Sequence, residues 1–190
     1  MTAPPRELDL PADCALIEVH VSELKQLFHS LDPTPFRQRD IDPKAEGFIA
    51  GWARELGPEQ SLALIVHVDQ ELPSVEEVQV LRSAFREYFG ERALHTRRSL
   101  RQLFRLGRTS LTIGLLFLAA SFLIGDLAET MLRETRFAGI ARESLLIGGW
   151  VAMWRPLEIF LYDWWPIRAE ARLFDRLSAM VVRVVPSRSG

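Results

Sequence analysis

"TSLTIGLLFLAASFLIG", residues 109–125, contains no charged side chain, although charged residues make up 25% of the chain. As an α-helix this segment would be about 25 Å long, at roughly 1.5 Å per residue. A helix needs about 17–25 predominantly apolar residues to cross the hydrocarbon core of a bilayer. The segment therefore predicts a membrane-spanning helix, which can continue as far as Met131.

A second apolar segment covers residues 144–167 and is also long enough to span, but it includes Arg155, Glu158 and Asp163. Pro156 disfavours helical conformation at the residue before it and could divide the segment. Two alternatives to a spanning hairpin stay open. One is a hairpin buried in a soluble core, and the other is a shallow hairpin that does not cross the bilayer.

The charges that flank the two segments predict their orientation. Six arginines between residues 92 and 108 precede the first segment, three between 168 and 176 follow the second, and the connector 126–143 mixes both signs. By the positive-inside rule, both termini are cytoplasmic and the connector lies outside. We therefore expect a multi-pass protein of the bacterial inner membrane.

Four arginines of the first group recur at spacings of four, four and three, which places them on one helical face: Arg97, Arg101, Arg105 and Arg108. We expect this face to contact anionic lipid headgroups on the cytoplasmic side. Nucleic-acid binding is the weaker alternative, because the net charge is −2 and no reader motif is present.

The ionisable residues of the second segment should have partners. An unpaired arginine near the centre of a membrane helix costs about 2.5–3.5 kcal/mol on insertion scales. Arg155, Glu158 and Tyr162 share one helical face with Asp163 at its edge, so Arg155 is expected to pair with Glu158. This arrangement either fixes hairpin register and assembly or marks an ion or proton pathway.

The facing helix can complete a polar seam. An antiparallel hairpin that turns near residues 134 and 135 would place Arg155 opposite Gly114. It would also place Glu158 opposite Thr109, Ser110 and Thr112, and Asp163 near Arg105 and Arg108.

Outside these segments the pattern predicts a small α+β domain. Residues 15–21 and 61–69 have strand patterns and both contain Val-His-Val, and 179–186 is a third candidate strand that would return the chain to the sheet. Helices are expected from Ser22 to Leu31, after Asp42 and from Val75. The expected organisation is a disordered tail (1–14), a cytoplasmic domain (15–108), a transmembrane hairpin (109–167) and a cytoplasmic helix and strand (168–190).

Recognisable catalytic chemistry is absent from the sequence. Cys14 is the only cysteine, which excludes an intramolecular disulfide and any multi-cysteine metal site. No phosphate-binding glycine loop, H-E-x-x-H or G-x-S-x-G motif occurs. His20 and His67 are expected on the polar face of their strands, with a metal site as the weaker alternative. We therefore expect no cofactor and no enzymatic activity.

Two segments carry a family resemblance: "LDPTPFRQRDIDPKAEGFIAGWARE" (31–55) and "ESLLIGGWVAMWRPLEIFLYDWWPIR" (143–168). They resemble an uncharacterised family of small bacterial two-helix integral membrane proteins, a domain of unknown function. The likeness covers most of the chain after the tail and implies a bacterial membrane protein, without an activity or catalytic residues.

Together these patterns favour a membrane-anchored cytoplasmic interaction or regulatory module that binds membrane lipids. As protein partners we expect further copies in a homo-oligomer, or another membrane protein. A subunit of an ion or proton channel or transporter that uses the intramembrane charges is the second hypothesis. An enzyme acting at the membrane surface is the third.

Overall fold

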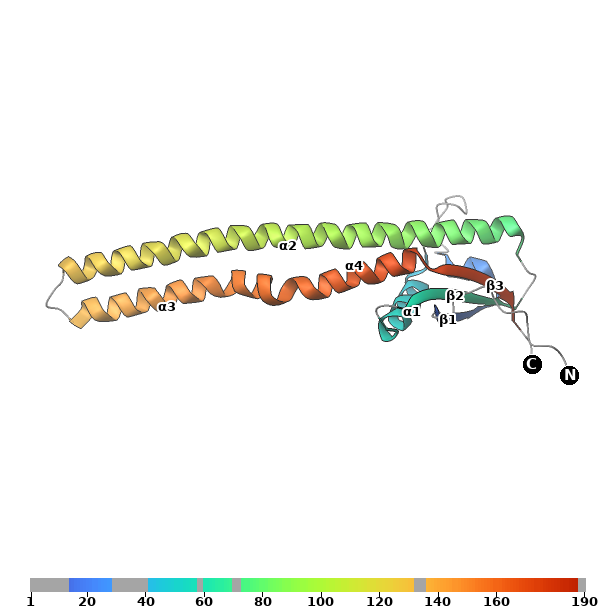
Figure 1. Cartoon of the computed structure of the whole chain (residues 1–190), viewed down its shortest axis with the longest axis horizontal. Helices are drawn as coiled ribbons and strands as arrows, with labels where there is room; N and C mark the ends of the chain where they lie inside the picture. Colours follow the sequence, from blue (N-terminus) through green and yellow to red (C-terminus); the bar gives the residue numbers. More distant parts are fainter. Residues whose placement is uncertain (1–13, 29–40, 58–59, 70–72, 132–135, 188–190) are drawn as a thin grey trace. The chain divides into compact units, whose positions relative to one another are not determined.

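The computed structural model describes residues 14–28, 41–57, 60–69, 73–131 and 136–187 (Figure 1). The tail expected over residues 1–14 lies outside this part of the chain, apart from Cys14. The elements in chain order are the strand β1 (Cys14–Val21), the 3-10 helix η1 (Leu24–Leu27), α1 (Pro43–Glu55), β2 (Ser61–Val68), α2 (Val75–Met131), α3 (Arg136–Glu158), the π-helical turn η3 (Ile159–Asp163), α4 (Trp164–Ser178) and β3 (Val181–Pro186).

The chain divides into two compact units. One consists of residues 1–95 together with 170–190, and the other of residues 96–169. Helix α2 is continuous over 57 residues, and its arginines from Arg97 to Arg108 fall within the second unit.

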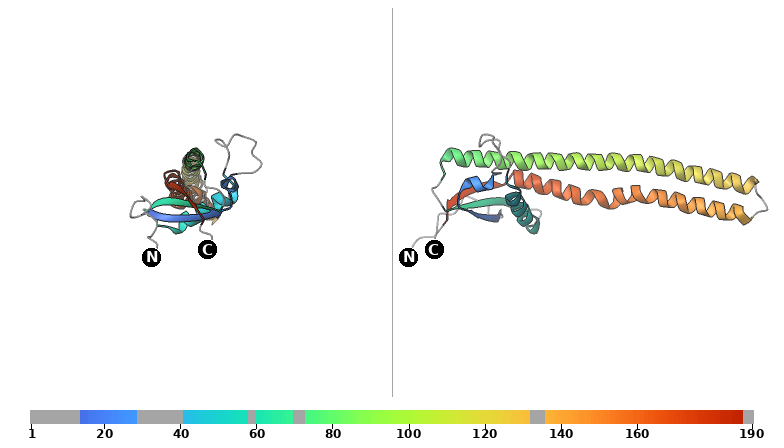
Figure 2. Two further views of the ribbon diagram at one scale, coloured as in Figure 1. Left: turned by 90° about the vertical axis from the view of Figure 1, so that its right-hand side faces the viewer. Right: turned by 180° about the vertical axis from the view of Figure 1, so that it is seen from behind.

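The first unit contains a parallel sheet with strand order β1-β2-β3 (Figure 2). Cys14 pairs with Ser61 at one end of the β1-β2 register, and Ala63 pairs with Val181 at the start of β3. The expected α+β class with a small sheet is therefore confirmed. The C-terminal strand pairs with β2 after the chain has passed through the whole second unit.

The largest hydrophobic cluster of this unit lies on one face of the sheet, and Ala63 and Ile65 of β2 are buried on the other face. Each parallel connection advances one strand in the same direction, and such crossovers are right-handed, so both connections fall on the same face. The strands and helices contribute buried side chains that include Ile17, Leu64, Val66, Val182, Ile49, Phe85, Phe89, Phe174 and Leu177.

Helix α1 is fixed at its start and against α2. Asp42 caps it by accepting a hydrogen bond from the Lys44 backbone N–H at 2.8 Å, as the Asp-Pro sequence predicts. Further along, the mostly buried Glu46 accepts hydrogen bonds from the Tyr88 hydroxyl at 2.6 Å and from Arg92 Nε at 2.8 Å. A charge-assisted tether therefore joins two helices that are distant in sequence.

The helix expected from Ser22 to Leu31 is wrong in its described part. Only one 3-10 turn, Leu24–Leu27, forms, and Phe28 has extended backbone with φ −112° and ψ 150°. Phe28 instead makes an antiparallel bridge with Ile41, and both side chains are buried in the core. Tertiary pairing therefore overrides the local helical pattern, while residues 29–31 lie outside the described part.

The second unit contains two long apolar segments. Among the described residues, Val75–Leu127 and Arg142–Ser178 form helices long and apolar enough to cross a membrane. The turn expected near residues 134 and 135 lies outside the described residues.

Candidate functional site

Small residues on α2 bring it into close contact with α3. A Cβ atom added to Gly107 would lie 2.9 Å from Ile159, and one added to Gly114 would lie 2.9 Å from Met153. The same close approach occurs between Gly149 and Leu118 and between Gly125 and Arg142. In each pair the residue numbers add to 266 or 267, so these contacts define one antiparallel register.

This register differs by about two residues from the expected one. Met153 rather than Arg155 lies opposite Gly114, so Arg155 is about level with Thr112 and Glu158 with Thr109. The uncharged run of α2 begins at Thr109, three residues before Thr112. Arg155, which is level with Thr112, therefore lies only about one helical turn from the end of the apolar zone. The ionisable residues are therefore near the boundary of the apolar zone rather than at its middle.

The helix geometry changes immediately after Pro156. Pro156 does not split the helix, because α3 continues to Glu158, but the next turn, Ile159–Asp163, is π-helical. Proline has no N–H to donate to the Ala152 carbonyl one turn earlier, and such irregularities often mark functional positions. The wider turn lies between Glu158 and Asp163 and so affects how their carboxylates approach Arg155.

Three charged side chains form the candidate site. Arg155 Nη1 donates to Glu158 Oε2 at 2.8 Å and lies 3.6 Å from Asp163 Oδ2. The side chains of Arg155, Glu158 and Asp163 are 58%, 42% and 31% exposed. We call this trio the Arg155 cluster. With one cation and two carboxylates, it carries a net charge of −1 when all three are ionised.

The structure gives the other predicted seam residues separate partners. Thr109 and Thr112 donate hydrogen bonds to backbone carbonyls in their own helix, and among the described residues neither bonds to Glu158. No bond from Ser110 to Glu158 occurs there either. Tyr162 is exposed. Asp163 lies beside Arg155 rather than beside Arg105 or Arg108.

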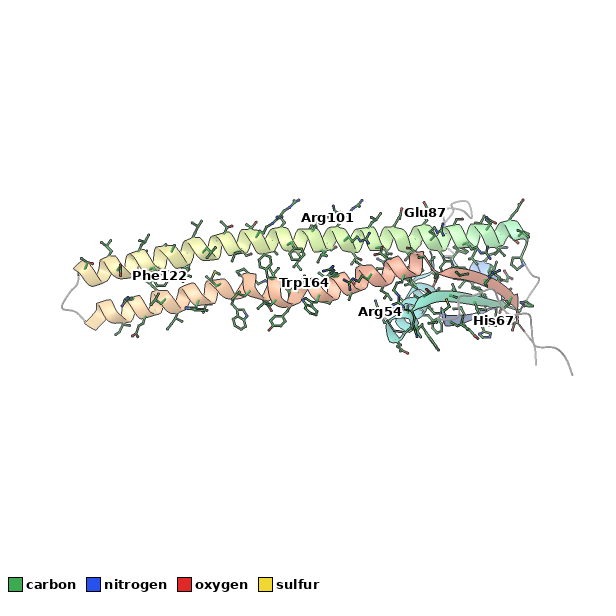
Figure 3. All side chains as sticks on the ribbon, in the orientation of Figure 1. Arg54, His67, Glu87, Arg101, Phe122 and Trp164 are labelled. Atoms are coloured by element: carbon green, nitrogen blue, oxygen red, sulfur yellow. The ribbon has the colours of Figure 1, made fainter. Side chains whose placement is uncertain are left out.

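The arginine face expected on α2 is exposed in the structure, as Figure 3 shows for the labelled Arg101. Arg97, Arg101, Arg105 and Arg108 all have exposed side chains. By the hairpin register, Arg101 and Arg105 are about level with an aromatic stretch, residues 160–165. Within that stretch the Trp164 ring lies beside Phe104 in a tilted arrangement, with ring centroids 6.4 Å apart, and 5.6 Å from the Arg168 guanidinium. Arginine and tryptophan therefore occur together at one level of the hairpin.

The two strand histidines are neighbours in the first unit. The rings of His20 and His67 are stacked with centroids 4.3 Å apart, and His67 Nε2 lies 3.4 Å from Glu18 Oε2. Among the described residues no group of three or more potential ligands could hold a metal ion. Cys14 is half-buried at the start of β1, and burial raises the pKa of its thiol.

Comparison with known protein families, curated proteins and solved structures gives no match. Membership of the two-helix membrane family therefore stays a prediction. The candidate site has to be interpreted from its own geometry.

One feature of the site is a regular row of small residues on α2. Gly107, Gly114 and Ser121 are buried and recur every seven residues, followed by Gly125 after four. Ser121 is 2% exposed, and its hydroxyl donates to the Phe117 carbonyl at 2.9 Å. Consideration of Gly114 alone misses this row. A search for small residues repeated every seven positions would have found it.

Proposed function

We propose that this protein is an interaction module that a two-helix hairpin anchors in a membrane. The observation that carries the proposal is where the apolar side chains of the hairpin point. Large side chains on both α2 and α3 are exposed, including Leu116 (67%), Leu123 (72%), Trp150 (71%) and Trp154 (71%). A hairpin buried in a soluble core would cover such side chains, whereas lipid-facing helices expose them.

The position of the Arg155 cluster supports a role in anchoring. Near the end of the apolar zone, Arg155 can extend its guanidinium toward the headgroups while its aliphatic stem stays in the apolar region. The aromatic stretch and the arginine face lie at the same level of the hairpin, near its beginning and its end. Tryptophan, tyrosine and arginine are the residues expected at a headgroup boundary on the cytoplasmic side. The bilayer would then hold the sheet unit at its cytoplasmic surface, with both termini inside.

The same geometry supports a membrane anchor more strongly than an ion or proton channel. The small residues of α2 pack directly against α3, so this hairpin encloses no path by itself. The Arg155 cluster also lies at the boundary rather than midway across the apolar zone. A channel or transporter role would need several copies or another protein, and it stays the second hypothesis.

Membrane extraction and protease access test the proposal. Membranes from bacteria that express the full chain are washed with carbonate, and protease access is measured for tags at both termini and within the connector 126–143. We expect retention in the membrane, with only the connector tag cleaved from outside. A soluble, lipid-independent protein would be released by carbonate. A shallow hairpin would be retained without cleavage of the connector tag, and either outcome would refute the spanning anchor.

A further inference from the structure

A pocket of about 730 Å³ lies in the first unit, between the first part of α2 and the segment where α4 ends and β3 begins. Its volume is within the range of about 300–1,000 Å³ that small-molecule sites have. Apolar side chains of the core form part of its lining. Its charged lining residues are Arg82, Arg86 and Glu87 of α2 and Arg183 of β3. We call it the arginine pocket.

The α2 side of this pocket is one polar helical face. The lining residues Gln79, Arg82, Ser83 and Arg86 recur at spacings of three, one and three, which places them on one side of the helix, with Glu87 at its edge. Arg82 and Arg86 are four residues apart, and like charges at this spacing destabilise a helix. An anion bound beside both arginines would relieve their repulsion.

Two of the pocket arginines have donors that the chain leaves unused. Arg82 Nε donates to the Val182 carbonyl at 2.9 Å, which holds this guanidinium beside β3, but its Nη groups have no acceptor in the described part of the chain. Arg183 Nε is shielded from solvent and likewise has no partner there. A shielded donor without an acceptor costs free energy, so an acceptor supplied by a ligand would be favourable here.

The charge of the pocket is not balanced by the chain. Elsewhere in the first unit arginines have carboxylate partners, as Arg54 has in Glu170 at 3.4 Å and Arg92 has in Glu46 at 2.7 Å. None of the three pocket arginines forms an ion pair with any residue that the structure describes. Three arginines and one glutamate give the lining a net charge of +2.

We propose that the arginine pocket binds the phosphate group of a small anionic molecule. A guanidinium group matches the geometry of phosphate oxygens and donates two parallel hydrogen bonds to them. A phosphate monoester carries a charge of about −1.5 to −2 near pH 7, which nearly balances the lining, whereas a single carboxylate balances only half of it. The pocket is much larger than one phosphate ion, so it has room for the organic part of the molecule.

Two kinds of molecule carry such a phosphate group, a soluble phosphorylated compound and a phospholipid. Both would place the same phosphate oxygens against the same arginines. Since all the lining residues belong to the first unit, the pocket does not depend on whether the hairpin spans a membrane.

Isothermal titration calorimetry of the full chain in a neutral detergent tests the site. Inorganic phosphate is the probe, and malonate, a dicarboxylate of similar total charge, is the comparison. We expect phosphate to bind saturably at one site and at least about threefold more tightly than malonate, because its charge is concentrated on one group. Absence of saturable phosphate binding, or equal binding of the two anions, would overturn the proposal.

Arg86→Gln is the most direct variant. The Arg86 side chain is exposed and makes no hydrogen bond or ion pair with a described residue, so its replacement leaves the fold intact. It should weaken phosphate binding about three- to tenfold. Arg101→Gln is the matched control, because it removes the same charge from an exposed position on the same helix outside the pocket. Equal losses in both variants would show a response to net charge alone and would overturn the site.

Glu87→Gln gives a test of opposite sign. This variant removes the only carboxylate of the described lining, so phosphate should bind about two- to threefold more tightly. Damage to folding cannot produce such a gain. Weaker binding in this variant would therefore contradict a phosphate site beside Glu87.

Vesicles distinguish the two sources of phosphate. The full chain is reconstituted in phosphatidylcholine with and without phosphatidylglycerol, and phosphate is titrated at about 0.15 M salt, where surface charge is screened beyond about 8 Å. Severalfold weaker binding with phosphatidylglycerol identifies a lipid headgroup as the occupant, and unchanged binding identifies a soluble compound. Carbonate extraction separates this proposal from the membrane anchor. Release of a chain that still binds phosphate overturns only the anchor, and retention of a chain that binds none overturns only the pocket.

Discussion

Gly148 and Gly149 are adjacent on α3, yet the same substitution should affect them in opposite ways. A Cβ at Gly149 would lie 2.5 Å from Leu118 Cδ1, which is closer than carbon atoms can approach. A Cβ at Gly148 would meet only Phe117 Cε1 at 3.8 Å, an ordinary van der Waals distance. Gly149→Ala should therefore disturb the α2–α3 contact, whereas Gly148→Ala should fit without movement.

The magnitudes follow from two opposing effects. Replacing glycine by alanine inside a helix favours the helix by up to about 1 kcal/mol, and this gain applies at both positions. Overpacking of a closely packed contact costs about 1–3 kcal/mol where side chains and backbone must both shift, and only position 149 is overpacked. The atom met at position 149 is the end of the Leu118 side chain, which can move by rotating, whereas the Leu118 backbone stays at 3.5 Å. We therefore expect Gly149→Ala to be less stable than Gly148→Ala by about 0.5–1.5 kcal/mol, the cost of an off-rotamer side chain.

Reversible unfolding of the purified protein by SDS in mild detergent, followed by far-ultraviolet circular dichroism, measures this difference. The double variant Gly149→Ala with Leu118→Ala removes the atom that clashes. Its loss of stability should therefore be smaller than the sum of the two single losses. Equal stability of the two alanine variants, or additive losses in the double variant, would refute the α2–α3 register.

Three other predictions concern separate parts of the molecule. Glu46→Ala should destabilise the first unit by about 1.5–3 kcal/mol in thermal unfolding, because it removes two hydrogen bonds, one of them charge-assisted. The exposed Glu55→Ala should change stability by less than about 0.5 kcal/mol. Because burial raises the pKa of Cys14, iodoacetamide should alkylate its thiol more slowly at pH 8 than it alkylates free cysteine. The alkylation rate should still rise above pH 9. A rate equal to that of free cysteine would contradict this prediction. Glu158→Gln should lower stability toward SDS by no more than about 1 kcal/mol, because the Asp163 carboxylate stays near Arg155. Arg155→Leu should cost more, because both carboxylates then lose the cation beside them. The reverse order would count against the Arg155 cluster.

The elements that the sequence predicts well are those with a long or strictly alternating pattern. The uncharged run 109–125 lies within a helix, and the alternating residues of β1 and the apolar run of β2 form adjacent strands. Asp42 before Pro43 correctly locates the start of α1. In each case the determining chemistry is local: hydropathy over a span, a period of two, or a cap.

The parts that the sequence misplaces depend on distant contacts. Phe28 leaves the expected helix because its backbone pairs with Ile41. The hairpin register moves by two residues because the small residues Gly107 and Gly125 decide it, and the connector length does not. Asp163 lies near Arg155 in place of Arg105 or Arg108, after a π-helical turn that no periodicity in the sequence indicates.

The late position of β3 has a consequence for synthesis. The ribosome makes β1 and β2 first, then the whole hairpin, and only afterwards the residues Val181–Pro186 that complete the sheet. Until then the nascent chain presents β2 as an unpaired edge, which is a site for misassociation and for recognition by chaperones and proteases. Completion of the sheet therefore marks a chain whose hairpin has been fully translated. A truncation anywhere in the hairpin would leave the cell with a sheet that lacks its last strand.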